Sequence, residues 1–132
     1  MRFFKEIIVL TTISVFLIVS DTCITKFTQN SIDEINTKVD SILEKALNEE
    51  NYIKDDEIKK INDLENSWKE IENKLAYFTE HDELEKVTVD INTIKAYAEA
   101  DLQKDAYEKM KELKYRIEHI KAKQKFKLNN MF

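Results

Sequence analysis

Between Ile58 and Phe78 apolar residues recur at alternating spacings of three and four, and polar residues fill the positions between them. This spacing keeps the apolar side chains on one stripe of an α-helix. At about 1.5 Å per residue the helix is roughly 30 Å long, and its stripe needs partner helices to exclude water. The stripe consists of Ile58, Ile61, Leu64, Trp68, Ile71, Leu75 and Phe78.

Three further stripes share this spacing, one before and two after the first. Short polar links at 48–51, 79–82 and 100–102 favour a chain that folds back on itself. The pattern therefore predicts an all-α fold, an antiparallel bundle of about four amphipathic helices. The spacing holds for about three heptads per stripe, so a dimeric coiled coil is also allowed. The stripes are Ile32, Ile35, Val39, Ile42, Ala46 and Leu47; Leu84, Val87, Ile91, Ile94 and Ala98; and Leu102, Ala106, Met110, Leu113, Ile117 and Ile120.

Capping residues predict where these helices begin. Ser31 with Glu34, and Asp82 with Glu85, have the spacing of a capping box, in which each side chain satisfies a free backbone amide. Asp55 or Asp56 is expected to cap the second helix, which should run to about Thr79, and Asp101 is expected to cap the fourth. Residues 25–30 are expected to form a polar connector, although nothing there forbids a continuous helix. Residues 121–127 are expected to fray.

The N-terminal segment has the pattern of a targeting element. Arg2 and Lys5 precede Ile7–Val19, an unbroken run of Ile, Val, Leu, Phe, Thr and Ser. Thirteen residues are short for a membrane span and typical of a signal-peptide core, but Phe3 and Phe4 can extend the apolar surface. Ser20 and Thr22 make a weak cleavage site. We therefore expect an uncleaved signal anchor, with cleavage as the second interpretation and a buried soluble helix as the third.

This interpretation divides the chain into a transmembrane anchor at 1–24 and an extracytoplasmic helical bundle at 25–132. The basic start places the N-terminus in the cytoplasm and makes the protein single-pass in the cell membrane. Cys23 is the single cysteine, so the fold contains no internal disulfide. The residues before it do not match a lipoprotein signal.

Composition excludes several classes of protein. The chain has no glycine and no proline, which makes a β-rich fold, a glycine-rich phosphate loop and an EF-hand improbable. The net charge of −5 hides an asymmetry. Seven acidic and three basic residues lie in 49–65, and nine basic and four acidic residues lie in 104–127. The two segments are expected to be solvated helix faces of opposite sign, and the alternative is a basic face for anionic lipid or an acidic partner.

The candidate chemistry is sparse. His81 and His119 stand near carboxylates, but neither has a second histidine three or four residues away, so no metal or other cofactor is expected. No serine is flanked by the glycines that form a nucleophile elbow, so no catalytic residue is assigned. Trp68 and Phe78 are expected in the core rather than in an aromatic pocket. The predicted structural core is Ile61, Leu64, Trp68, Ile71, Leu75, Phe78, Leu84, Val87, Ile91, Ile94, Met110, Leu113, Ile117 and Ile120.

The C-terminal segment is the candidate binding element. It combines alternating lysines with an apolar cluster, which either packs on the bundle or meets a partner or the lipid surface. It lacks interleaved exposed aromatic residues of the kind that bind single-stranded nucleic acid, so no nucleic acid is expected. The predicted partner-binding residues are Lys121, Lys123, Lys125, Phe126, Lys127, Leu128, Asn130, Met131 and Phe132.

Four short segments, in this order and spacing, carry a family resemblance. They are Leu64-Glu65-Asn66-Ser67-Trp68, His81-Asp82-Glu83-Leu84-Glu85, Ile117-Glu118-His119-Ile120 and Leu128-Asn129-Asn130-Met131-Phe132. The chain resembles the family named domain of unknown function 4363, small anchored helical proteins of spore-forming Gram-positive bacteria. The resemblance implies the anchor and an all-helical ectodomain, and it draws attention to Trp68, His81 and Asn130. It implies no catalytic residues.

The functional hypothesis is a non-enzymatic interaction or scaffold protein. It is anchored in membrane lipid by its N-terminus and binds another membrane or envelope protein, with a homodimer as a further possibility. The alternative is a sensor or carrier domain that binds a small ligand or metal between its helices.

Overall fold

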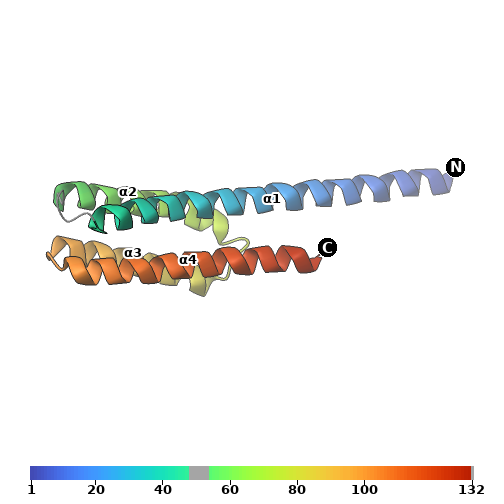
Figure 1. The fold of residues 1–132 in the computed structure, drawn as a ribbon. Coiled ribbons are helices and arrows are strands. Elements are labelled where there is room, and N and C mark those ends of the chain that lie inside the picture. The colour runs from blue at the N-terminus through green and yellow to red at the C-terminus, as the bar shows by residue number, and fades with distance from the viewer. Residues whose placement is uncertain (48–53, 132) are drawn as a thin grey trace. The chain divides into compact units, whose positions relative to one another are not determined.

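The computed structural model describes residues 1–47 and 54–131, and all four elements in these ranges are helices (Figure 1). They are α1 (Arg2–Leu47), α2 (Lys54–Leu75), α3 (His81–Glu99) and α4 (Gln103–Met131). The predicted all-α fold class is confirmed. The turn predicted at 48–51 lies outside the described residues. The chain divides into two compact units, Met1–Asn30 and Ser31–Phe132, which are described separately below.

The N-terminal unit is helical and apolar. Every residue from Met1 to Val19 is exposed, and α1 is the one described helix that is long and apolar enough to cross a membrane. The hydroxyl groups of its apolar run bond within the helix. Thr11 Oγ1 donates to the Ile7 carbonyl at 2.7 Å and Ser14 Oγ to the Leu10 carbonyl at 2.9 Å. No polar side chain named here therefore needs a partner outside the helix if lipid surrounds it.

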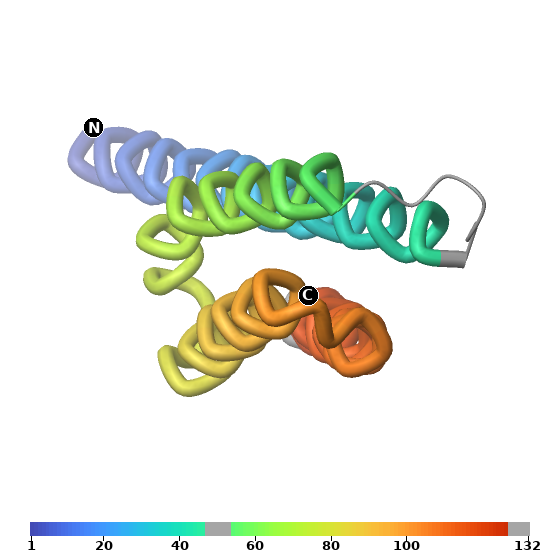
Figure 2. The backbone as a smooth tube through the Cα atoms, turned by 90° about the vertical axis from the view of Figure 1, so that its left-hand side faces the viewer, coloured from blue at the N-terminus to red at the C-terminus, as the bar shows by residue number. Residues whose placement is uncertain are grey.

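The second unit is a four-helix bundle in which successive helices run in opposite directions (Figure 2). Ion pairs join each helix to its neighbour in the chain. Lys38 of α1 contacts Asp63 of α2 at 2.5 Å, and Lys95 of α3 contacts Glu65 of α2 at 2.9 Å. Lys114 of α4 pairs with Asp40 of α1 and closes the ring. The stripes thus meet within one chain.

The apolar stripes form one core along the bundle. Every residue of the predicted core except Ile71 and Phe78 is buried in it. Ile71 is half-buried and packs against the core. The prediction that Phe78 belongs to the core is wrong. Phe78 is half-buried, lies after the end of α2 and is not part of the core. The core is Ile32, Ile35, Val39, Ile42, Ile61, Leu64, Trp68, Leu75, Leu84, Val87, Ile91, Ile94, Ala98, Met110, Leu113, Ile117 and Ile120.

α1 is helical throughout residues 25–30, so these residues belong to the continuous helix that the sequence allowed and do not form the polar connector that was expected. Thr25 Oγ1 donates to the Asp21 carbonyl at 2.7 Å within the helix, whereas Thr28 Oγ1 is buried without a hydrogen-bond partner among the described residues. Ser31 therefore lies inside a helix and cannot form a capping box with Glu34. Polar composition alone does not break a helix that contains neither glycine nor proline.

Both ends of α2 differ from the prediction. The helix begins at Lys54, so Asp55 and Asp56 lie in its first turn rather than at the cap. There their charges still favour the positive end of the helix dipole. The helix ends at Leu75 instead of Thr79, because a tight turn follows in which the amides of Phe78 and Thr79 both donate to the Leu75 carbonyl.

The start of α3 also lacks the predicted cap. Glu80 occupies the N-cap position and makes no side-chain cap hydrogen bond, while Asp82 lies in the first turn. Thr79, which directly precedes Glu80, uses its hydroxyl in a contact with another helix. Its Oγ1 accepts a hydrogen bond of 2.9 Å from Gln124 Nε2 of α4. The Thr79 hydroxyl thus contacts α4 and does not cap α3.

Asp101 terminates α3 rather than capping α4. Its φ of 61° is left-handed, and its amide bonds to the Ala98 carbonyl while the Leu102 amide bonds to the Tyr97 carbonyl. This is the Schellman pattern, which usually places glycine at the left-handed position. A chain without glycine uses aspartate, which tolerates this conformation better than most residues. The Asp101 carboxylate also contacts Lys54 at 2.6 Å.

The fraying predicted for residues 121–127 is wrong, because α4 continues to Met131. Contacts with α1, with α3 and with the segment between α2 and α3 hold this part of α4. Lys121 pairs with Asp33 of α1, and Lys123 contacts Glu80 and Glu83 at 3.1 and 3.0 Å. Gln124 Nε2 donates to the Phe78 carbonyl at 2.8 Å.

Candidate functional site

A buried carboxylate joins α3 to α4. Asp90 is only 2% exposed, and its two oxygens face two cations of α4, Arg116 Nε at 2.7 Å and Lys109 Nζ at 3.3 Å. Lys109 also contacts Glu112 at 2.9 Å. The hydrogen bond to Glu112, followed by the contacts with Asp90, raises the pKa of Lys109 although burial opposes the shift. The Asp90 charge is thus balanced within the fold, as a buried charge must be.

The sequence analysis did not single out Asp90, although its position in the sequence indicates a buried carboxylate. Asp90 lies three residues after Val87 and four before Ile94, which places it on the apolar stripe of α3. An acidic residue at a core position needs a buried cation. The partner could not be chosen from sequence alone, because 104–127 offers nine basic residues.

Two shallow surface depressions meet at Arg116. One, of about 410 Å³, lies between α3 and α4, and the other, of about 490 Å³, lies along α4. Their rims include two exposed apolar side chains, Val89 at 54% and Tyr115 at 75%. We call this surface the α3–α4 face. It is lined by Asp82, Glu85, Lys86, Val89, Asp90, Lys111, Glu112, Tyr115, Arg116 and His119.

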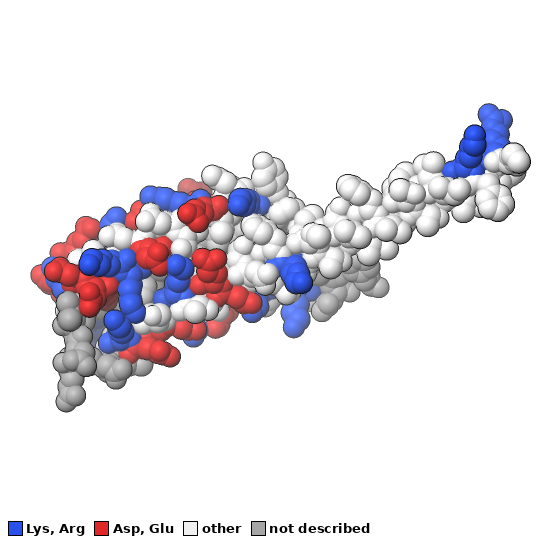
Figure 3. Space-filling view, turned by 90° about the horizontal axis from the view of Figure 1, so that it is seen from above, with Lys and Arg blue, Asp and Glu red and all other residues white. Residues whose placement is uncertain are grey.

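Acidic and basic side chains are intermixed on the surface of the bundle that Figure 3 shows. Ion pairs within the fold account for many of them, including the Glu65 pairs with Lys69 at 3.0 Å and Lys95 at 2.9 Å. The two segments of opposite net charge therefore contribute to packing, as when Lys114 of the basic segment pairs with Asp40.

Trp68 is buried and is also hydrogen-bonded. Its Nε1 donates to Thr88 Oγ1 of α3 at 2.8 Å, and the same hydroxyl donates to Glu72 Oε1 of α2 at 2.8 Å. The indole therefore fills the core and satisfies its polar atom at once. This arrangement is structural and presents no reactive group to solvent.

Both histidines are exposed. His81 is the first residue of α3, and His119 lines the depression along α4. Within residues 1–47 and 54–131, no group of three or more His, Cys, Asp and Glu side chains is placed to hold a metal ion. The described part of the chain thus offers neither histidine a set of metal ligands.

The structure divides the predicted partner-binding segment. Lys121 and Lys123 are held by carboxylates of the bundle, whereas Lys125 and Phe126 are exposed. Lys127, Leu128, Asn130 and Met131 belong to α4, of which only the backbone is described there, and Phe132 lies outside the described residues. Partner binding by this segment stays a prediction, and its exposed described side chains are Lys125 and Phe126.

Glu65 should make stability sensitive to acid. Its hydrogen bonds with Lys95 and Lys69 lower its pKa below the ordinary value of 4.5, so its contribution is complete above that value and is lost as the pH falls through the lower, folded-state pKa. We expect Glu65→Gln to cost about 1 kcal/mol at pH 7 and to make the loss of stability in acid shallower. Denaturant unfolding of the full chain in detergent, followed from pH 7 to 3, measures both effects. The exposed Glu70→Gln is the control, and an equal change in its acid profile would contradict the role given to Glu65.

A family model described as a domain of unknown function, DUF4363, matches residues 22–131. The match begins after the apolar run and extends to the last residue of α4, so it includes the whole described part of the bundle. No curated protein and no solved structure matches the chain. Because the family model covers most of the sequence, the resemblance inferred from the motifs is confirmed, and the chain belongs to the DUF4363 family.

Proposed function

We propose that this protein is a non-enzymatic, membrane-anchored interaction protein. The apolar part of α1 crosses the cell membrane with Arg2 and Lys5 on the cytoplasmic side, and the bundle lies outside the cytoplasm. The length and apolar character of α1 support the crossing. The basic residues before the apolar run support the orientation.

The α3–α4 face is the observation on which this proposal depends. It combines an exposed tyrosine, an exposed valine and an arginine within adjoining depressions. Tyrosine and arginine are enriched in protein interfaces and contribute most to their affinity. The depressions are shallow and their lining carries charges of both signs, which suits a protein surface better than a small ligand. We therefore place the partner, another membrane or envelope protein, on this face.

The C-terminal segment is a weaker choice for a protein partner. Lys121 and Lys123 are engaged within the bundle, so among the side chains described in this segment Lys125 and Phe126 are the exposed ones. The α3–α4 face therefore replaces it as the partner site in this proposal.

Site-specific photocrosslinking in native cells tests the proposal. We expect p-benzoylphenylalanine at Tyr115 to give a crosslinked product with a second protein, because Tyr115 lies on the α3–α4 face. The same group at Lys59, an exposed position of α2, should give none. A membrane-impermeant maleimide should label the exposed single cysteine, Cys23, in intact cells and so report the side on which the chain emerges.

Three outcomes would contradict the proposal in different ways. A product from Lys59 but not from Tyr115 would move the interface to α2. A third variant carries the photoreactive residue at Phe126, and a crosslinked product from this variant alone would return the interface to the C-terminal segment. Labelling of Cys23 only after permeabilisation would reverse the orientation.

A further inference from the structure

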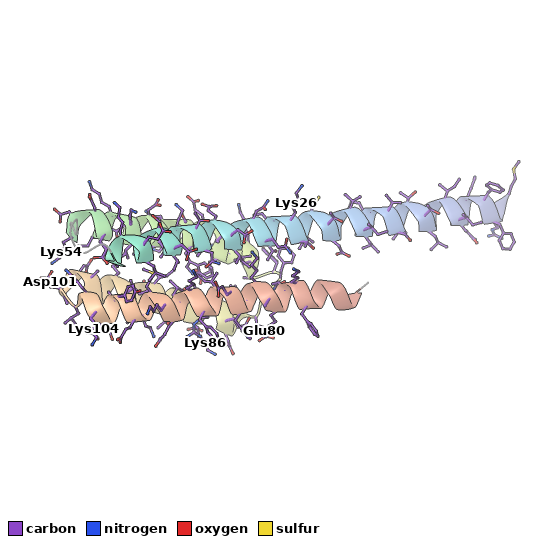
Figure 4. The ribbon with its side chains drawn as sticks, viewed as in Figure 1. Lys26, Lys54, Glu80, Lys86, Asp101 and Lys104 are labelled. Atoms are coloured by element: carbon purple, nitrogen blue, oxygen red, sulfur yellow. The ribbon has the colours of Figure 1, made fainter. Side chains whose placement is uncertain are left out.

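One end of the bundle gathers the segment between α2 and α3, the last turns of α4 and the start of the bundle part of α1. Gln124 donates to the Phe78 carbonyl at 2.8 Å, and Lys123 contacts Glu80 at 3.1 Å. Lys121 pairs with Asp33, which is two residues after the beginning of this unit. We call this the connector end. Figure 4 labels Glu80 toward this end of the bundle and Lys54, Asp101 and Lys104 at the opposite end.

The connector end exposes aromatic side chains. Tyr77 is 84% exposed and Phe126 is 67% exposed, although burial would remove a large apolar surface from water. Lys125 is exposed next to Phe126. At the opposite end the described residues expose one large apolar side chain, Leu102. Lys54 and Asp101 form an ion pair there. Among the residues that the structure describes, aromatic side chains are thus exposed at the connector end and not at the opposite one.

A short stretch of chain joins the apolar segment to the bundle unit. The apolar run ends at Val19, and the bundle unit begins twelve residues later at Ser31. Even a fully extended chain of this length spans at most about 43 Å. The residues between are helical, and a helix of this length spans about 18 Å. If the apolar run crosses a membrane, the connector end is therefore the end of the bundle that the chain tethers to it.

We propose that the connector end binds the lipid surface of the membrane in which α1 is anchored, with Tyr77 and Phe126 in the interfacial layer and Lys125 directed to headgroup phosphates. This inference rests on the proposed membrane crossing. Tyrosine concentrates at the membrane interface, where its ring is apolar and its hydroxyl meets water. Lysine covers apolar surface with its stem and keeps its charge at the headgroups. The membrane surface would then hold the bundle by its connector end. The α3–α4 face, on the side of the bundle, would remain accessible to a protein partner.

Nitroxide labels on the purified full chain in phosphatidylcholine vesicles test this contact. Each label is attached to one cysteine in a Cys23→Ser background, at Tyr77→Cys, Phe126→Cys, Tyr115→Cys or Val9→Cys. We expect labels at 77 and 126 to collide about threefold less often with a water-soluble nickel chelate than the label at 115, and more often with oxygen, which concentrates in lipid. All four wild-type positions are exposed, so the substitutions should leave the fold intact, and circular dichroism checks this.

The label at residue 9 separates the inference from the anchor on which it rests. Lipid exposure at 9 together with water exposure at both 77 and 126 would overturn the lipid contact and leave the anchor standing. Water exposure at 9 would overturn the anchor. Spectral broadening between labels at 126 in neighbouring molecules would show that a second copy covers this end, and would also overturn the lipid contact.

Discussion

Replacing Trp68 with alanine is expected to lower the free energy of unfolding by about 3–5 kcal/mol. The indole is buried in the core between α2 and α3, so its removal leaves a cavity that the surrounding helices cannot fill. The change also leaves Thr88 without the donor that now reaches its hydroxyl at 2.8 Å. Chemical denaturation of the full chain in detergent, followed by far-ultraviolet circular dichroism, measures the loss without depending on the tryptophan.

Two further variants separate the cavity from the hydrogen bond. Trp68→Phe keeps an aromatic ring but loses the indole N–H, and it should cost clearly less than the alanine variant. Lys69→Ala should change stability by under about 0.5 kcal/mol, because Lys69 is exposed and contacts Glu65 within its own helix. Equal losses for Trp68→Ala and Lys69→Ala would show that the buried face of α2 has been assigned wrongly.

Replacing Arg116 with alanine is expected to cost about 2–3 kcal/mol, below the 3–5 kcal/mol typical of a broken buried ion pair. The effect is large because Asp90 stays buried when its closest cation is removed. It is reduced because Lys109 still faces the carboxylate at 3.3 Å and Arg116 is itself partly exposed. The same unfolding measurement applies.

A double-mutant cycle identifies the source of that loss. Asp90→Ala removes the buried charge itself, so adding Arg116→Ala to it should cost much less than Arg116→Ala costs alone. Lys86→Ala, an exposed change on the same face, should have almost no effect on stability. Additive losses for Asp90 and Arg116 would mean that their contact contributes nothing.

Periodicity predicted the helices because burial of an apolar stripe is the strongest constraint on each of them. Trp68, Ile91 and Leu113 were placed in the core from spacing alone, and all three are buried. The boundaries were harder to predict, because tertiary contacts influence some of them. Thr79 could not act as a cap once Gln124 of α4 bound its hydroxyl, and spacing within one helix carries no information about a residue 45 positions away.

The candidate site was predictable only in part, for a related reason. Lysines in 121–127 were expected to meet a partner, but Lys121 and Lys123 meet carboxylates of the same chain. A charge run shows that cations are present and does not show which acids face them. Asp90 is the converse case, since its position on an apolar stripe required a buried cation while Arg116 could be identified only from the packing of α3 on α4.

The closure of the bundle by α1 and α4 has a consequence for biosynthesis. The α1 core residues Ile32, Ile35, Val39 and Ile42 leave the ribosome first, but the α4 residues that complete their surroundings follow roughly 80 residues later. At about 5–20 residues per second this interval lasts on the order of 4–16 s. During that time the nascent chain exposes part of an apolar stripe next to its apolar N-terminal segment. We therefore expect this stripe to be prone to aggregation until the last helix has been made.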